Sequence, residues 1–245
     1  MIDIKELVFP SRLYCACCGN IIDKSRTYGL CDFCLENFRW NLKRLETREG
    51  VRYIFCVEYG LLERGLIFRL KYSGDKFIAK TIAQIMNDKL ESLKTQGLWD
   101  YPPEETLLIP VPLHRKKEEK RGFNQAALIG KHLASMMGVE FLARGLIRTK
   151  ETEAMRGLNA QERRANIRGT ISVNRKWRED IEGKRVILLD DFYTTGSTAS
   201  ACIDALMEGN PREITFLAYA RRTPFEAIYG EEELPMEKQS FDDII

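Results

Sequence analysis

Apolar runs alternate along the chain with segments whose apolar residues recur at helical spacing. Strands are predicted where apolar, β-branched and aromatic residues cluster, at 51–60, 106–113, 139–149, 185–191 and 213–223. Helices are predicted at 61–74, 75–93, 125–138 and 197–209. Strands that are apolar on both faces and alternate with helices are typical of a mostly parallel sheet covered on both sides. The pattern therefore predicts an α/β fold.

Two polar segments interrupt this pattern. Residues 36–50 are predicted to be a linker or short helix, and the highly charged residues 114–124 are predicted to be a loop. Within the helix predicted at 61–74, helical spacing places four apolar side chains near one face: Leu62, Leu66, Phe68 and Leu70.

The length of 245 residues suits one α/β domain with a small appendage. We expect a cysteine-rich module at 1–45, the α/β domain at 46–225 and an acidic tail at 226–245. No apolar run reaches the roughly 18 to 20 residues that a membrane span needs. The first residues carry acids and no continuous apolar stretch, which argues against a signal peptide. A cytoplasmic location is therefore expected.

Charge is spread unevenly although the net charge is only +2. Residues 115–168 hold 13 Lys and Arg against 6 Asp and Glu, whereas residues 226–245 hold one Lys against 7 acids. A basic middle segment suits an anionic partner, but a solvated, salt-bridged surface explains it as well.

Five of the seven cysteines fall in residues 15–34, where they form two C-x-x-C pairs 12 residues apart. Four thiolates in this arrangement can surround a zinc ion. The predicted ligands of this structural zinc site are Cys15, Cys18, Cys31 and Cys34. Cys17 is a spare thiol in this interpretation. Disulfides and a redox-active C-x-x-C remain alternatives, although disulfides suit a cytosolic chain poorly.

The stretch RVILLDDFYTTGSTAS, residues 185–200, combines a strand, two acids and a small polar loop. In a parallel sheet, ligands bind beyond the carboxyl ends of the strands, where Asp190 and Asp191 would lie. A helix starting near Ser197 or Thr198 would offer backbone N–H groups to a phosphate, and Gly196 would allow close approach. A sugar phosphate fits this pattern, with its hydroxyls on the acids and its phosphate in the loop.

This stretch resembles the phosphoribosyl-pyrophosphate motif of type I phosphoribosyltransferases. The segments IPVPLHRKKEEKRGFNQAALIGKHLA and LIRTKETEAMRGLNAQERRANIRGT, together with the paired C-x-x-C, look like the signatures of the ComF family of competence-associated proteins. The resemblance covers most of residues 12–222. It implies the type I phosphoribosyltransferase fold: a mostly parallel sheet flanked by helices, with a small N-terminal zinc-binding module. One departure is Met155, where the family pattern leads us to expect glutamine.

The resemblance also implies roles for individual residues. Asp190 and Asp191 would bind ribose hydroxyls, and the 5′-phosphate would be bound by Thr194, Thr195, Gly196, Ser197 and Thr198. The pyrophosphate loop would consist of Val111, Pro112, Leu113, His114 and Arg115. Supporting residues would be Arg121, Gly122, Asn124, Arg163 and Arg164. Residues 149–166 would form a hood over the site. Mg²⁺ would bridge pyrophosphate and ribose oxygens.

Two functions follow from this resemblance. One is a transferase or hydrolase that acts on phosphoribosyl pyrophosphate with Mg²⁺ and is linked to natural competence and DNA uptake. The other is a non-catalytic accessory that binds single-stranded DNA and keeps a vestigial phosphoribosyl pocket, with competence proteins such as a ComF-operon helicase as partners. The sequence holds no clear general base for an acceptor, so no catalytic residue is assigned and enzymatic activity is left open.

Overall fold

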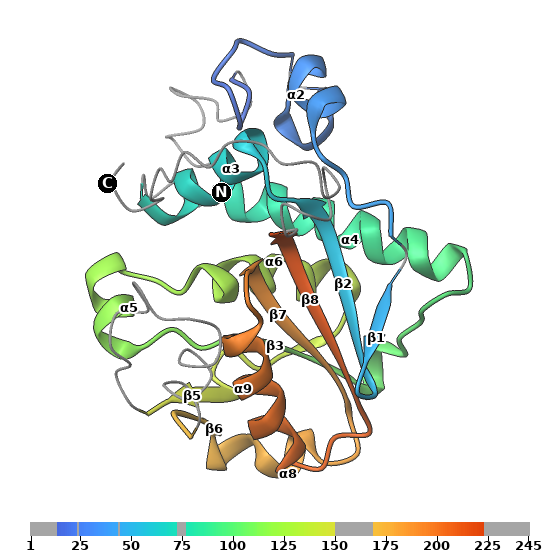
Figure 1. Ribbon diagram of the computed structural model, residues 1–245, viewed down its shortest axis with the longest axis vertical. Coiled ribbons are helices and arrows are strands. Elements are labelled where there is room, and N and C mark those ends of the chain that lie inside the picture. Colours follow the sequence, from blue (N-terminus) through green and yellow to red (C-terminus); the bar gives the residue numbers. More distant parts are fainter. Residues whose placement is uncertain (1–13, 24, 44, 73–76, 150–168, 223–245) are drawn as a thin grey trace, which may run out of the picture.

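A six-stranded sheet in the order β1-β2-β8-β7-β3-β4 forms the centre of the computed structural model (Figure 1). The structure describes residues 14–23, 25–43, 45–72, 77–149 and 169–222. The strands of this sheet are β1 Glu46–Arg48, β2 Val51–Glu58, β3 Thr106–Pro110, β4 Glu140–Phe141, β7 Arg185–Tyr193 and β8 Glu213–Arg221. All neighbours are parallel apart from β1 and β2. The predicted mostly parallel α/β architecture is therefore confirmed.

Helices cover both faces of the sheet, which is why its central strands are apolar on both sides. The helices are α3 Leu61–Tyr72, α4 Phe77–Thr95, α5 Arg115–Arg121, α6 Gln125–Met137, α8 Arg178–Ile181 and α9 Ser197–Met207. One core cluster joins α3, α4 and α6 to the sheet, and a second joins α9 to its other face. The short antiparallel pair β5 Leu146–Arg148 and β6 Ile171–Val173 packs with α9.

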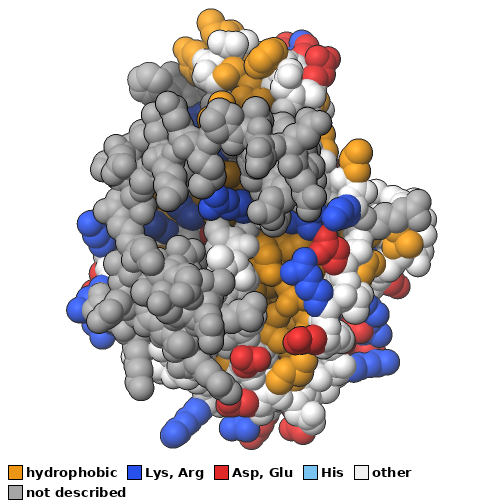
Figure 2. All heavy atoms as spheres, viewed as in Figure 1, with side chains coloured by type: hydrophobic (Ala, Val, Ile, Leu, Met, Phe, Trp, Pro, Cys, Tyr) orange, Lys and Arg blue, Asp and Glu red, His pale blue; other side chains and the backbone are white. Residues whose placement is uncertain are grey.

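The N-terminal cysteine-rich segment packs on α3 and α4 through hydrogen bonds as well as apolar contacts. It contains the short helix α2, Asp32–Asn37. Arg69 of α3 donates to the carbonyl of Ala16, and Thr81 of α4 donates to the carbonyl of Tyr28, 3.1 Å away. Its buried Leu30 and Phe38 belong to the same core cluster as α3 and α4. Figure 2 shows further apolar side chains on the surface at this end of the molecule.

Several local predictions are corrected by tertiary context. Residues 114–124 are not a plain loop, because Arg115–Arg121 form helix α5 between an N-cap at His114 and a left-handed C-cap at Gly122. Residues 36–50 include the edge strand β1, which forms by pairing with β2. The strand predicted at 139–149 is split into β4 and β5, which belong to different sheets.

The predicted apolar face of α3 is correct in part. Leu66 and Leu70 are buried, but the Phe68 side chain is 48% exposed, and Ile67 takes the buried position beside Leu66. Among the described residues, no helix is both long and apolar enough to cross a membrane. The predicted hood at 149–166, apart from Thr149, and the tail at 226–245 lie outside the described residues.

Candidate functional site

Asp190 and Asp191 lie on β7, at the point in the sheet where the connections from β3 and from β7 lead to opposite sides. Strands β3 and β7 are parallel neighbours, with Pro110 opposite Leu189. From β3 the chain passes through α6 to β4 on one side, whereas from β7 it passes through α9 to β8 on the other. Helices α6 and α9 cover opposite faces of the sheet. Ligands of open α/β sheets bind at such a switch point, beyond the carboxyl ends of the strands.

The carboxylate of Asp191 is buried and already has partners within the protein. Asp191 is 3% exposed, and its Oδ2 lies 2.6 Å from the ammonium Nζ of Lys71, near the end of α3. Gln125, the first residue of α6, donates from Nε2 to Asp191 Oδ1 across 3.4 Å. The backbone N–H of Asp191 donates to Oδ1 of Asp190, 2.8 Å away. Contacts from α3 and α6 therefore meet at the Asp191 carboxylate, whereas the Asp190 carboxylate accepts from the backbone of β7.

The pKa values of the two carboxyl groups shift in opposite directions, because one cation lies beside one member of an adjacent pair. Burial and then the neighbouring negative charge of Asp191 raise the pKa of Asp190 well above its ordinary value. Burial also opposes ionisation of Asp191, but the Lys71 ammonium outweighs it and lowers the pKa of Asp191. Asp191 is therefore the member of the pair that ionises more readily.

The loop that follows the acids delivers an uncapped helix N-terminus to the same place. Helix α9 begins at Ser197, as predicted, and its N-cap Gly196 has a left-handed φ of +76°. No side chain caps this terminus. Thr195 Oγ1 and Ser197 Oγ lie 3.0 Å apart and form a hydrogen bond. The first backbone N–H groups of α9 are therefore available to an anion.

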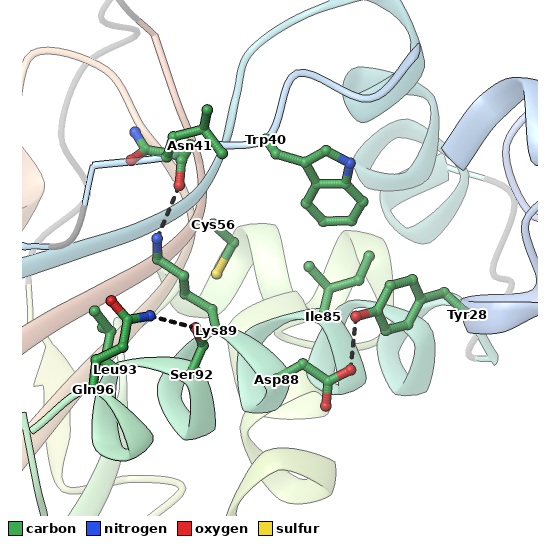
Figure 3. A pocket seen from close by; sticks show the side chains of 11 residues that line it. Tyr28, Trp40, Asn41, Cys56, Ile85, Asp88, Lys89, Ser92, Leu93 and Gln96 are labelled. Carbon is green, nitrogen blue, oxygen red and sulfur yellow. Dashed lines mark hydrogen bonds between the residues drawn. The ribbon is translucent and has the colours of Figure 1, made fainter. Parts of the chain in front are cut away.

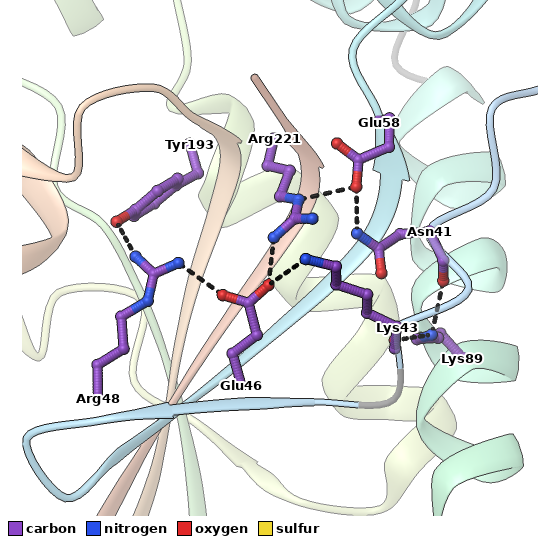
Figure 4. A network of polar contacts seen from close by, with 8 residues as sticks. All are labelled: Asn41, Lys43, Glu46, Arg48, Glu58, Lys89, Tyr193 and Arg221. Atoms are coloured by element: carbon purple, nitrogen blue, oxygen red, sulfur yellow. Dashed lines mark hydrogen bonds and ion pairs between the residues drawn. The ribbon is translucent and has the colours of Figure 1, made fainter. Parts of the chain in front are cut away.

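Tyr193 and Arg48 are neighbours of this loop that the sequence alone did not assign to the site. A Cβ atom on Gly196 would lie 2.5 Å from the Tyr193 hydroxyl, so this hydroxyl packs directly against the glycine. Arg48 Nη1, on β1, donates to the same hydroxyl across 3.1 Å. Figure 4 shows that Arg48 also pairs with Glu46, which in turn pairs with Arg221. The β1 edge thus reaches the phosphate loop predicted from sequence.

The predicted pyrophosphate loop starts as an extension of β3. The backbone N–H of Val111 donates to the carbonyl of Leu189, 2.8 Å away, and the Val111–Pro112 peptide is trans. The imidazole of His114 accepts from the backbone N–H of Lys116 at the start of α5. Arg115 is exposed and pairs with Glu119, 2.8 Å away. That this loop binds pyrophosphate stays a prediction.

Of the five supporting residues predicted from sequence, three lie in the part of the chain that the structure describes. Asn124 is the N-cap of α6, as predicted, and Arg121 donates to the Gln125 side chain that reaches Asp191. Gly122 ends α5 in a left-handed conformation, with φ of +84°. Arg163 and Arg164 lie outside the described residues.

The four predicted zinc ligands lie together, with their sulfur atoms all within 4.8 Å of one another: Cys15, Cys18, Cys31 and Cys34. The sulfur atoms of Cys18 and Cys31 are 3.6 Å apart, close to the spacing of about 3.8 Å that a tetrahedral zinc with 2.3 Å bonds imposes. Cys17 is not a member of this group, because its thiol donates to the carbonyl of Leu62 on α3, 3.3 Å away, although it also lies beside Cys34. The donor set therefore fits zinc, and the spare thiol links this module to α3.

A separate cavity of about 350 Å³ lies between the cysteine-rich module and α4 (Figure 3). Tyr28 and Trp40 line one side, and Cys56 lies beside the Lys89 side chain. Lys89 Nζ donates to the carbonyls of Asn41 and Lys43, both 2.9 Å away, so this ammonium fastens the connecting segment to α4. Tyr28 belongs to the cysteine-rich segment, but no pattern of residues in the sequence predicted a cavity here.

Comparison with known proteins gives competence proteins as relatives. No family model matches the chain. It is 31% identical to Competence protein F of Haemophilus influenzae over 156 residues, which are 64% of this chain and 66% of that protein. It is 29% identical to Competence protein ComFC of Bacillus subtilis over 153 residues, 61% of this chain and 55% of that protein. It is 26% identical to DNA utilization protein YhgH of Escherichia coli K12, and this match covers 64% of this chain and 66% of that protein. The matched part of the chain thus spans, at most, just under two thirds of the length of each of these relatives.

Similar solved structures include phosphoribosyltransferases, at low overall agreement. A hypoxanthine phosphoribosyltransferase from Staphylococcus aureus matches with a TM-score of 0.39 and 12% identity, over 60% of this chain and 75% of that one. The glutamine phosphoribosylpyrophosphate amidotransferase of B. subtilis matches with a TM-score of 0.36 and 16% identity, over 57% of this chain and 25% of that one. Agreement at this level does not decide a ligand.

The mostly parallel sheet and its flanking helices place the protein in the class of the type I phosphoribosyltransferase fold, with an appended four-cysteine cluster. Within that class, the chain belongs to the ComF family of competence proteins.

Proposed function

We propose that the protein binds phosphoribosyl pyrophosphate together with Mg²⁺ at the carboxyl ends of β3 and β7. The observation that carries this proposal is the convergence of two features at one switch point. Near the end of β7 lie the half-buried Asp190 and the buried Asp191, and the uncapped N-terminus of α9 follows after a glycine at positive φ. The first feature suits hydroxyl groups and the second suits a phosphate.

Each group would act on a different part of the substrate. Asp191, ionised beside Lys71, would accept hydrogen bonds from ribose hydroxyls, with Asp190 next to it. The five residues of the loop would surround the 5′-phosphate: Thr194, Thr195, Gly196, Ser197 and Thr198. The segment 111–115 continues β3 beside the acids and would face the pyrophosphate. Bound Mg²⁺ would neutralise pyrophosphate oxygens, which are ligands that this ion prefers.

The reaction class that fits such a site is phosphoribosyl transfer to an acceptor or to water. Positioning and charge stabilisation would supply most of the catalysis, because the bond to pyrophosphate breaks with positive charge developing on the ribose. The acceptor is left unassigned, since no general base has been identified near the acids.

A second part of the proposal is that the four-cysteine cluster binds a structural zinc ion. All four ligands would come from the protein, so this zinc would hold the N-terminal module together and take no part in catalysis. The module contributes Leu30 and Phe38 to the core against α3 and α4. Zinc would therefore also support the end of α3, where Lys71 lies.

Thermal unfolding with and without ligand tests the binding proposal. Phosphoribosyl pyrophosphate with Mg²⁺ should raise the melting temperature in a saturable way, by an amount corresponding to about 2.7 kcal/mol at a hundredfold excess over Kd. The double substitution Asp190→Asn, Asp191→Asn should abolish this rise. Asp204→Asn, an exposed acid on α9, serves as the matched control and should keep it. An unchanged melting temperature for the wild-type protein would reject the proposal.

Single-stranded DNA binding is the second candidate, favoured by the basic helix α5 and by the relatives named for competence and DNA utilization. Five of its seven residues are basic: Arg115, Lys116, Lys117, Lys120 and Arg121. DNA affinity should fall steeply as salt rises, and replacing Lys116, Lys117 and Lys120 by Gln should flatten that dependence. Absence of binding at low salt, or a salt-independent affinity, would reject this candidate.

A further inference from the structure

Lys71 is the cation that the fold places against the acid pair. It is the penultimate residue of α3, and its ammonium lies 2.6 Å from Asp191 Oδ2. The two side chains are 20% and 5% exposed, so water screens this pair much less than it screens a surface ion pair. No sequence motif assigned Lys71 a role, and 120 positions separate the two residues in the chain.

A relay of side chains holds the same carboxylate from the opposite side. Gln125 donates to Asp191 Oδ1, and Arg121 donates to the Gln125 side-chain oxygen. The Arg121 guanidinium also lies over the ring of Tyr72, 5.9 Å from its centroid, next to Lys71 in α3. Asp191 is therefore held in one orientation by α3 and α6 together, with its two oxygens committed to different partners.

The charge of the acid pair depends on this arrangement. Lys71 faces Asp191 from α3, and Gln125 faces it from α6 without a charge. On the α9 side, Cys202 lies within electrostatic reach of Asp190, and Arg148 of β5 lies near Cys202. Of these groups, Lys71 is the charged one in direct contact with a carboxylate. Asp191 is therefore the carboxyl of the pair that ionises more readily.

We propose that Lys71 is a positioning residue of this site: its ammonium keeps Asp191 ionised and oriented, so that Asp191 is the member of the pair that accepts from the hydroxyls of the bound sugar. This inference rests on the proposed function, because it assigns a role within the same site. It makes Lys71 act through Asp191, without itself contacting the substrate. Without the ammonium, two buried neighbouring carboxyls would retain protons to higher pH and would offer the hydroxyls a weaker acceptor.

Calorimetric titration with phosphoribosyl pyrophosphate and Mg²⁺ between pH 7 and 9 tests this role. The proteins compared are the wild type, Lys71→Met, Lys71→Arg and the control Lys80→Met, an exposed lysine of α4. The wild type should bind with nearly constant affinity over this range. Lys71→Met should bind on the order of tenfold more weakly at pH 7, as loss of a charged hydrogen-bond acceptor predicts, and should recover affinity as pH rises. Lys71→Arg and Lys80→Met should behave like the wild type.

The possible outcomes separate the role of Lys71 from the proposed function. Failure of the wild-type protein to bind would reject the proposed function itself. Wild-type binding with unchanged affinity in Lys71→Met would overturn the role of Lys71. A loss of affinity that is the same at every pH would also overturn it, since Lys71 would then contact the ligand directly. If Lys71→Met unfolds, the double variant Lys71→Met, Asp191→Asn removes both charges; it should fold and bind weakly at every pH, and tight binding by it would refute the proposal.

Discussion

The side-chain amide of Asn124 donates a hydrogen bond to the carbonyl oxygen of Val111, 3.0 Å away. The same side chain accepts from the backbone N–H groups of Ala126 and Ala127, which caps α6. One buried residue therefore ties the end of β3 to the start of α6 across the predicted pyrophosphate loop. The loop's basic helix α5 extends outward between these two fixed ends.

Asn124→Ala should lower the free energy of unfolding by about 1 to 3 kcal/mol, because it removes both the cap and the bond to Val111. Asn124→Ser keeps an oxygen that can cap α6 but is too short to reach Val111. Urea unfolding should therefore rank the serine variant between the alanine variant and the wild type. Equal losses in the two variants would show that the bond to Val111 contributes nothing.

Replacing Cys18 by Ser should remove zinc from the purified protein and lower its melting temperature. The expected wild-type content is about one zinc per chain, from the four-thiolate rule. Cys17→Ala is the matched control, because its thiol lies outside the cluster and bonds to Leu62. Metal analysis and thermal unfolding check both variants. Zinc retained in Cys18→Ser, or lost in Cys17→Ala, would contradict the ligand assignment.

Asp190→Asn and Asp191→Asn should change stability in opposite directions at neutral pH. The pKa of Asp190 is raised by burial and by Asp191, so its favourable contribution exists below the unfolded value of about 3.9 and is lost as pH rises through the folded pKa. Asp190→Asn should therefore stabilise the protein at pH 7, and the gain should disappear near pH 3.

The contribution of Asp191 to stability has the opposite pH dependence. Although burial opposes its ionisation, Lys71 lowers its pKa, so its contribution is present above about pH 3.9 and is lost as pH falls through the folded value. Asp191→Asn should cost up to about 3 kcal/mol at pH 7 by leaving Lys71 unpaired. Unfolding curves at several pH values check both signs. If Asp190→Asn were less stable than the wild type at pH 7, this would contradict a raised pKa for Asp190.

Gly196→Ala should destabilise the protein by about 1 to 3 kcal/mol, since alanine is strained at positive φ and its Cβ would meet the Tyr193 hydroxyl at 2.5 Å. Tyr193→Phe alone should cost about 1 kcal/mol by losing the bond from Arg48. The double variant should lose less than the sum, because the hydroxyl that clashes is gone. Strict additivity in a double-mutant cycle would show that the two residues do not touch.

Local patterns were sufficient for the central elements of the fold and for the cysteine cluster. Strand β7 and helix α9 follow directly from an apolar run, two acids and a small polar loop within 20 residues. The two C-x-x-C pairs likewise place four thiols within reach of one another. Helix α5 and strand β1 were missed, because α5 has an almost wholly charged sequence and β1 forms by pairing with β2.

The amino-acid sequence by itself determined the alternation of strands and helices, the acid pair at the end of a buried strand and the glycine that opens onto α9. These depend on neighbours in the chain, whose spacing can be read directly. The tertiary structure alone decided that Lys71 meets Asp191 and that Arg48 reaches the Tyr193 hydroxyl beside Gly196. Those contacts join segments far apart in the chain, and the order of strands in the sheet, which no local pattern encodes, brings them together.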